Sequence, residues 1–175
     1  MEWQELLIDG YGRILEALEE ALKGMTQDDL NQQPRSDCNS MGWLAWHLTR
    51  VQDYYLIEGL AKKEQLWVKD GWYAKFNLPP NPADTGEGCN SEDLAAFKSP
   101  DVETQLAYHR AVLERTKRYI TSLSASDLDR ELNEPWDQPP TIGRALTSIL
   151  NDNLQHVGQI AYVRGFLKGK GWLGY

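Results

Sequence analysis

The sequence predicts an all-α protein, a four-helix bundle with one long crossover between its second and third helices. Four segments of about 20 to 28 residues place apolar side chains at every third or fourth position, which is the period of an amphipathic helix. A segment rich in proline and glycine separates the second of these from the third. No segment shows the strict alternation that is typical of a strand, so we expect almost no sheet.

The first half of the chain predicts two helices. The first covers residues 3–22, and Gly24 follows it as a stop signal. Residues 25–38 can support only a short helical turn and are expected to form a connector. Ser40 is a good N-cap, and the apolar spacing after it predicts a second helix that continues to roughly residue 63.

The second half begins with the crossover. The periodicity fails over residues 64–100, so we expect a long irregular connection, and structureless stretches of this length are usually functional. A third helix is expected over residues 101–123, followed by a connector over residues 124–140. Thr141 then caps a last helix that extends to about residue 167.

Composition limits the classes of function. A chain of 175 residues fits one domain, which we predict to cover residues 1–175. The net charge of -8 argues against nucleic-acid binding, which depends on clustered Lys and Arg. Two cysteines outside any CxxC motif, no signal peptide and no apolar run of membrane-spanning length predict a protein of the reducing cytoplasm. We therefore expect no nucleic-acid partner and no membrane partner.

Two of the three histidines suggest a metal site. His47 and His156 lie on the apolar stripes of the second and last predicted helices, and Asp152 precedes His156 by four residues. Residues with this spacing share a helix face, so both side chains are able to point at one ion, and His47 would complete the set. Three protein ligands leave open positions on the metal, as in catalytic sites. Two imidazoles and one carboxylate suit zinc, iron, nickel or manganese alike. We expect zinc or nickel ahead of iron or manganese.

Other interpretations of these residues stay open. A single histidine on an apolar helix face is usually a packed core residue, and His109 on the third helix is either that, a pocket residue or a rival third ligand. Asn153 and Gln159 are candidates to orient the ligands, although an amide on a buried seam also sets helix register. Trp43 and Trp46 are candidates to line a pocket, although aromatic residues at helical spacing more often form the core.

Two motifs resemble a known family. Residues 43–48, Trp-Leu-Ala-Trp-His-Leu, are similar to the second-helix signature of the DinB-like family, and residues 156–160 are similar to its fourth-helix signature. The turn at residues 84–88 and the Arg164-Gly165 pair also match that pattern. The resemblance implies an up-down-down-up bundle that holds a divalent metal through one histidine of helix two and two ligands of helix four. Many members have histidine as the first helix-four ligand, where this chain has Asp152, and maleylpyruvate isomerases resemble it in placing a carboxylate there.

The resemblance also implies an activity. The wider superfamily includes enzymes that use mycothiol, bacillithiol or glutathione, the mycothiol-dependent maleylpyruvate isomerase among them. It therefore implies a metal-dependent thiol transferase, isomerase or hydrolase that acts on an electrophilic small molecule, with a low-molecular-weight thiol as a candidate cofactor. The alternatives are a non-catalytic, stress-associated metal-binding bundle, which would form a homodimer through an exposed helix face, and an interaction module without metal.

Overall fold

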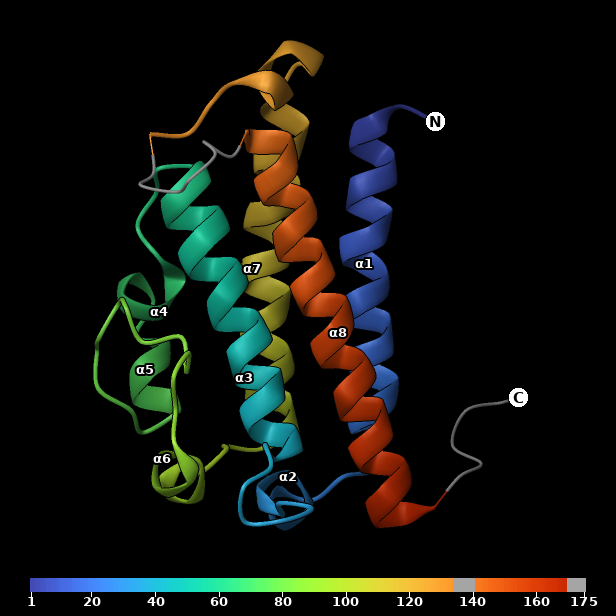
Figure 1. Cartoon of the computed structure of the whole chain (residues 1–175), viewed down its shortest axis with the longest axis vertical. Coiled ribbons are helices and arrows are strands. Elements are labelled where there is room, and N and C mark those ends of the chain that lie inside the picture. Colours follow the sequence, from blue (N-terminus) through green and yellow to red (C-terminus); the bar gives the residue numbers. More distant parts are fainter. Residues whose placement is uncertain (134–140, 170–175) are drawn as a thin grey trace.

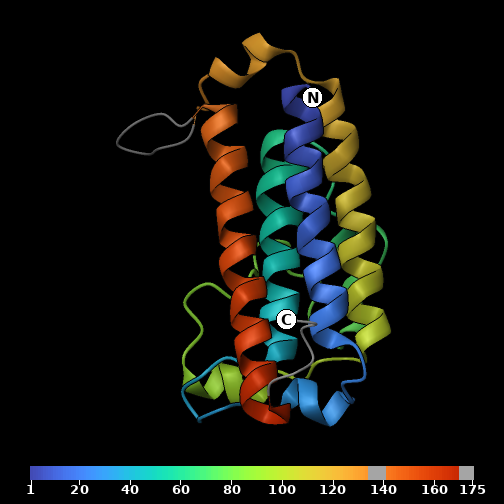
Figure 2. The same ribbon diagram turned by 90° about the vertical axis from the view of Figure 1, so that its right-hand side faces the viewer.

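The computed structural model describes residues 1–133 and 141–169, and it confirms the four-helix bundle. Helices α1 and α8 run in one direction and α3 and α7 in the other, which is the up-down-down-up order (Figure 1). Around the bundle, α1 lies between α8 and α7, and α3 packs on the opposite sides of the same two helices (Figure 2). The long helices are α1 (Trp3–Leu22), α3 (Met41–Val51) with its continuation η1 (Gln52–Leu60), α7 (Val102–Ser122) and α8 (Ile142–Lys168).

All four long helices begin where the sequence predicts, and three of them begin at a capping side chain. The side chain of Ser40 accepts a hydrogen bond from the backbone amide of the residue three positions on, and Asp101 and Thr141 do the same. Each bond satisfies an amide that has no partner within its own helix, which stabilises a helix start by about 1 kcal/mol. These caps therefore fix the starts of α3, α7 and α8.

The second long helix changes its winding in the middle. It is α-helical as far as Val51 and π-helical over η1, a change that the apolar spacing does not predict. π-Helical segments are rare and occur frequently at functional sites. The helix ends at Leu60, and two residues later Lys62 has a backbone φ of 52°, which lies in the left-handed region that favours glycine.

We expect the substitution Lys62→Gly to stabilise the protein by about 0.5–1 kcal/mol. A left-handed conformation is unfavourable for any residue with a Cβ atom, and this cost exceeds the extra chain entropy that glycine loses on folding. Thermal unfolding followed by circular dichroism would measure the gain. The matched control is Lys63→Gly, at a residue without a positive φ, where glycine is expected to lower the melting temperature. A loss of stability in both variants would contradict the strain at Lys62.

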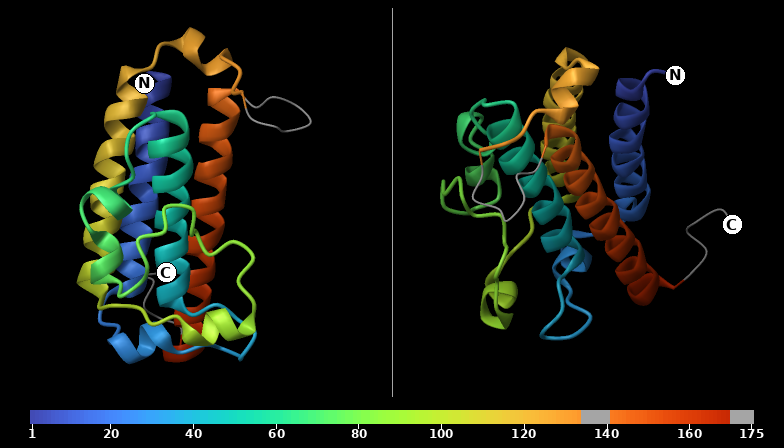
Figure 3. Two further views of the ribbon diagram at one scale, coloured as in Figure 1. Left: turned by 90° about the vertical axis from the view of Figure 1, so that its left-hand side faces the viewer. Right: turned by 45° about the horizontal axis from the view of Figure 1, so that its top comes forward.

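The crossover is more ordered than predicted. It contains three short helices, α4 (Leu66–Lys69), α5 (Trp72–Lys75) and α6 (Ser91–Ala96), and runs along the outside of the bundle beside α3 and α7 (Figure 3). Its aromatic side chains Trp67, Trp72 and Phe76 pack around Tyr108 of α7 with ring centroids 5.1–5.8 Å apart. Helices this short contain too few residues to show a helical period, which explains the incorrect expectation of an irregular chain.

Two buried charges on α3 and η1 hold this crossover in place. The Arg50 guanidinium is fully buried and donates to the carbonyls of Pro82 and Asp84 at 2.7 and 2.9 Å. It also donates to the amide oxygen of Gln65 at 2.7 Å, and it lies 4.8 Å from the centroid of the Trp67 ring. One turn later, Asp53 accepts bonds from two amides at the start of α4 and from the Tyr108 hydroxyl. The start of the crossover and its middle segment at residues 82–84 are thereby fastened to one helix face.

Two shorter elements complete the described chain. They are α2 (Gln27–Asn31), which is the short turn expected before Pro34, and the single 3₁₀ turn η2 (Ala125–Asp129). The end of the connector predicted for residues 124–140 lies outside the described residues. No helix of the described part is both long and apolar enough to cross a membrane. The single domain predicted for residues 1–175 stays a prediction.

Candidate metal centre

The structure brings His47, Asp152 and His156 together between α3 and α8. One potential ligand atom from each residue lies within 4.8 Å of the other two. The two imidazole rings meet edge to face, with centroids 4.6 Å apart and planes at 89°. Because α3 and α8 are antiparallel neighbours, residues more than one hundred positions apart in the sequence reach one point. This group is the one that the helical spacing predicts.

His47 is held in one orientation from two sides. Its ring stacks on Trp43, with centroids 4.7 Å apart and planes at 11°, and it is 95% shielded from solvent. Its Nδ1 atom is hydrogen-bonded to the backbone carbonyl of Thr85. A carbonyl only accepts, so Nδ1 carries the proton and Nε2 keeps the free lone pair that a metal requires. The crossover therefore sets the tautomer of the helix histidine.

The turn that carries Thr85 depends on a glycine. Gly86 has a φ of 87°, and a Cβ atom there would lie 2.7 Å from the Trp43 ring and 2.8 Å from the Trp46 ring. Only glycine combines this backbone conformation with so close an approach to the two indoles. Trp43 and Trp46 also line a small cavity of about 380 Å³ beside the turn, as well as packing in the core.

His156 lies at the edge of the buried seam rather than at its centre, which corrects the predicted position. The fully packed residue at this level of α8 is Val157, while the His156 side chain keeps 17% of its surface exposed. Its Nδ1 atom is 2.8 Å from the Oε1 atom of Gln159, and its Nε2 atom is 3.4 Å from Asp152 Oδ1. As at His47, Nδ1 donates and Nε2 faces the other ligands, so Gln159 occupies the predicted orienting position.

The donor set fits a divalent cation. Asp152 Oδ2 is buried and has no hydrogen-bond partner among the described residues, which is costly for a carboxylate oxygen unless a cation or water satisfies it. Ligands of one tetrahedral zinc lie roughly 3.3 Å apart at the usual Zn–N distance of about 2.0–2.1 Å. The three side chains would therefore close in by small rotations around an ion. Protein atoms would still leave part of its coordination sphere open.

The two histidines have different proton affinities. Burial lowers the pKa of His47, and the hydrogen bond with Thr85 offsets only part of this effect, so the ring is neutral at neutral pH. Burial also acts to lower the pKa of His156, but the bonds with Asp152 and Gln159 outweigh it, so that pKa lies above its ordinary value. His156 is therefore the ligand whose proton a binding metal would have to displace.

His109 and Asn153 do not join this group. His109 is fully buried on α7, and its Nδ1 atom lies 3.0 Å from the hydroxyl of Thr49. Asn153 is also fully buried, and its amide nitrogen donates to the side-chain oxygen of Gln52, 2.7 Å away. Gln52 in turn donates to Thr116 of α7, so this polar chain links three helices inside the bundle. Both predicted residues thus lie in the bundle interior and outside the metal group.

The buried position of His109 predicts a pH dependence of stability. Burial lowers the pKa of His109 to about 4, whereas an unfolded histidine titrates near 6.5. Between these two pKa values, His109 is protonated in the unfolded chain and neutral in the folded protein. The free energy of unfolding therefore falls as the pH decreases. The loss is about 3 kcal/mol, begins below pH 6.5 and is complete near pH 4.

Urea unfolding in the presence of a chelator, at several pH values, would measure this loss. The variant His109→Gln keeps a polar group opposite Thr49 but does not titrate. We expect its free energy of unfolding to fall by about 3 kcal/mol less than that of the wild type between pH 7 and pH 4. His47 and His156 titrate in both proteins and cancel in this comparison. An equal decrease in the free energy of unfolding for the two proteins would show that His109 is not kept neutral in the folded state.

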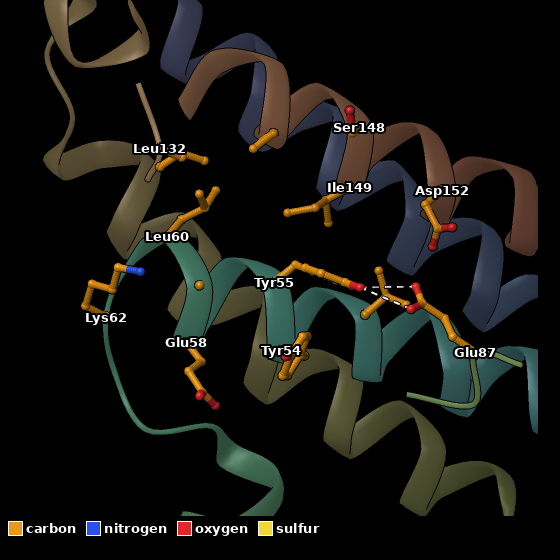
Figure 4. A pocket seen from close by; sticks show the side chains of 13 residues that line it. Tyr54, Tyr55, Glu58, Leu60, Lys62, Glu87, Leu132, Ser148, Ile149 and Asp152 are labelled. Carbon is orange, nitrogen blue, oxygen red and sulfur yellow. Dashed lines mark hydrogen bonds between the residues drawn. The ribbon is translucent and has the colours of Figure 1, made fainter. Parts of the chain in front are cut away.

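A larger cavity of about 550 Å³ opens beside Asp152 (Figure 4). Glu87, from the same turn as Thr85, lies at its edge and accepts a hydrogen bond from the Tyr55 hydroxyl at 3.1 Å. The helical spacing did not predict that Thr85, Glu87, Arg50 or Asp53 contribute to this region. The available signal was the turn at residues 84–88, which matches the DinB-like pattern.

The fold and the site together define a helical bundle with a candidate metal centre between α3 and α8. The chain belongs to the DinB superfamily, whose family model matches residues 11–160. Its structure is similar to one described as the crystal structure of the conserved protein of locus from Enterococcus faecalis, with a TM-score of 0.88 and 28% sequence identity. That similarity covers 97% of this chain and 99% of the other. The search of curated proteins found no match.

Proposed function

We propose that this chain is a divalent-metal-dependent enzyme that transfers a thiol, or adds water, to an electrophilic small molecule. The observation that carries the proposal is the His47–Asp152–His156 group, in which both imidazoles direct Nε2 toward the other ligands. One oxygen of its carboxylate has no hydrogen-bond partner among the described residues. Open three-ligand sites of this kind are typical of catalytic rather than structural metals. Zinc or nickel is the proposed ion, and the same donor set also suits iron and manganese.

Each residue of the centre has a defined part in this proposal. The three ligands would hold the ion, Thr85 and Gln159 would keep the imidazoles oriented, and Trp43 would exclude water from one face of His47. A bound divalent ion lowers the pKa of a coordinated thiol or water, so the nucleophile is available at neutral pH. Glu87 lies beside the same cavity as Asp152 and is the carboxylate placed to accept the released proton.

The transfer reaction is a nucleophilic substitution that needs no oxidant or reductant. The thiolate sulfur attacks the electrophilic carbon, a C–S bond forms, and the leaving group departs with the electron pair of the bond that breaks. The thiol proton passes to a base or to solvent. In the hydrolytic version, water takes the place of the thiol and the proton follows the same path.

A turnover assay tests this proposal. We expect the zinc-loaded protein to conjugate an aryl halide with a low-molecular-weight thiol, or to hydrolyse an activated ester. Activity should disappear after chelation, return with added zinc and be absent in His47→Ala. Undiminished turnover in the metal-stripped protein would contradict the metal-dependent mechanism. Stoichiometric zinc without turnover of any thiol or ester substrate would instead favour the non-catalytic, metal-binding alternative.

The homodimer stays a prediction. The exposed apolar side chains of α8 are Leu154, Tyr162 and Phe166, whose spacings of eight and four residues place them along one face of that helix. Such a face is the part of the bundle that a second copy would be expected to cover.

A further inference from the structure

The 550 Å³ cavity beside the candidate metal centre has two chemically different ends. Asp152 and Glu87 lie at one end, and Lys62 and Leu132 lie at the other (Figure 4). The α8 wall extends from Ala145 to Asp152, which at the helical rise per residue is roughly 10 Å. This volume lies within the range of small-molecule pockets, about 300–1,000 Å³.

The wall between these ends is mainly apolar. Tyr54 and Tyr55 of η1 add aromatic surface beside it, and Ser148 adds a hydroxyl group. The apolar lining residues are Val51, Leu60, Leu132, Ala145 and Ile149. A ligand that fills the cavity therefore needs an apolar body, with polar groups only at its ends.

Among the described residues, the charged groups that line the cavity leave one cation without a partner. Glu87 accepts from the Tyr55 hydroxyl, and Glu58 accepts from the side-chain amide of Gln65. Asp152 belongs to the metal group. The Lys62 ammonium, in contrast, takes part in no ion pair or hydrogen bond with the described residues. It is the charged group of this cavity that is left for a ligand.

The backbone around Lys62 also sets this end of the cavity apart. The π-helical segment η1 forms one wall of the cavity, and Lys62, two residues past the end of η1, has a left-handed backbone in which glycine would fit without strain. Unfavourable conformations of this kind are concentrated at ligand-binding and catalytic sites. The π-helical winding of η1 and the left-handed backbone of Lys62 are separate observations, and both the segment and the residue line the same cavity.

We propose that this cavity binds a small carboxylic acid, with its carboxylate at Lys62 and its apolar chain along the wall between η1 and α8. The opposite end of the ligand then lies beside Asp152, and only this last point rests on the proposed function. A single negative charge is favoured over a doubly charged phosphate because three carboxylates line the same cavity and repel additional negative charge.

Calorimetric titration with hexanoate, 1-hexanol and acetate tests this proposal, with the full-length protein in both chelator-treated and zinc-loaded forms. Hexanoate is expected to bind roughly fivefold more tightly than hexanol because of the ammonium. It is expected to bind more than about tenfold more tightly than acetate because of its apolar chain. In Lys62→Met the preference for hexanoate over hexanol should disappear, while hexanol affinity stays unchanged. The matched control Lys63→Met alters a neighbouring exposed lysine that does not line the cavity, and it should keep the preference.

Three results would overturn the proposal. They are equal affinities for hexanoate and hexanol in the wild type, a preference that survives Lys62→Met, and no saturable binding of either probe. A preference that requires zinc and ignores Lys62 would mean that the metal recognises the carboxylate, which refutes this proposal and leaves the proposed function intact. A Lys62-dependent preference in a protein that binds no zinc would support this proposal while refuting the proposed function.

Discussion

Replacing Arg50 with Met is expected to lower the free energy of unfolding by about 3–5 kcal/mol. The guanidinium is fully buried, and its removal leaves the Asp53 carboxylate, 3.6 Å away, without its counter-charge in the interior. The carbonyls of Pro82 and Asp84 would also lose their donor without gaining water. Denaturant unfolding monitored by tryptophan fluorescence measures the loss.

The control for this prediction is Arg110→Met. Arg110 also lies on a long helix and binds two carboxylates, those of Glu19 and Glu103, but its side chain is 43% exposed. Exposed ion pairs contribute about 1 kcal/mol or less, so this variant should remain close to the wild type. A loss below about 1 kcal/mol in Arg50→Met would show that the crossover does not depend on the buried guanidinium.

Arg50→Met should also weaken the metal centre. The crossover segment that Arg50 holds through Pro82 and Asp84 leads directly into Thr85, whose carbonyl orients His47. Loss of a group that orients a metal ligand typically reduces metal affinity by about 10- to 100-fold. The same effect is expected at the other histidine for Gln159→Leu, which removes the partner of His156 without burying a new charge.

The second large effect is expected on metal binding itself. Substitution of His47, Asp152 or His156 by Ala removes one of three protein ligands, and we expect zinc affinity to fall by roughly 100-fold or more, since each ligand contributes about 3 kcal/mol. The fold should survive in Asp152→Ala because that side chain is partly exposed and makes no hydrogen bond that a helix needs. Zinc titration with a competing chromogenic chelator measures the affinity, and far-ultraviolet circular dichroism checks the fold.

Local patterns were sufficient to predict the bundle and the convergence of His47, Asp152 and His156. Ser40, Asp101 and Thr141 cap helices whose apolar spacing is regular, so both signals lie within a few neighbouring residues. His47 and His156 came together because antiparallel packing of α3 on α8 aligns their apolar faces. These features depend on helical periodicity, which a single sequence displays directly.

The remaining features depend on contacts between distant segments. Arg50 and Asp53 would ordinarily belong to a solvated helix face, and only the carbonyls and amides contributed by residues 65–84 make their burial favourable. The ligand-orienting group of Thr85 is a backbone carbonyl, which no side-chain pattern indicates. The π-helical winding of η1 and the edge position of His156 likewise arise from packing between helices.

The most direct test of the metal centre compares zinc binding in three proteins prepared without a nickel column: the wild type, Asp152→Ala and His109→Gln. We predict about one zinc per chain in the wild type and in His109→Gln, and a loss of tight binding in Asp152→Ala. Elemental analysis together with the chelator titration gives both stoichiometry and affinity. A wild type that binds no divalent metal, or a site that is lost with His109 and kept without Asp152, would contradict the centre assigned to His47, Asp152 and His156.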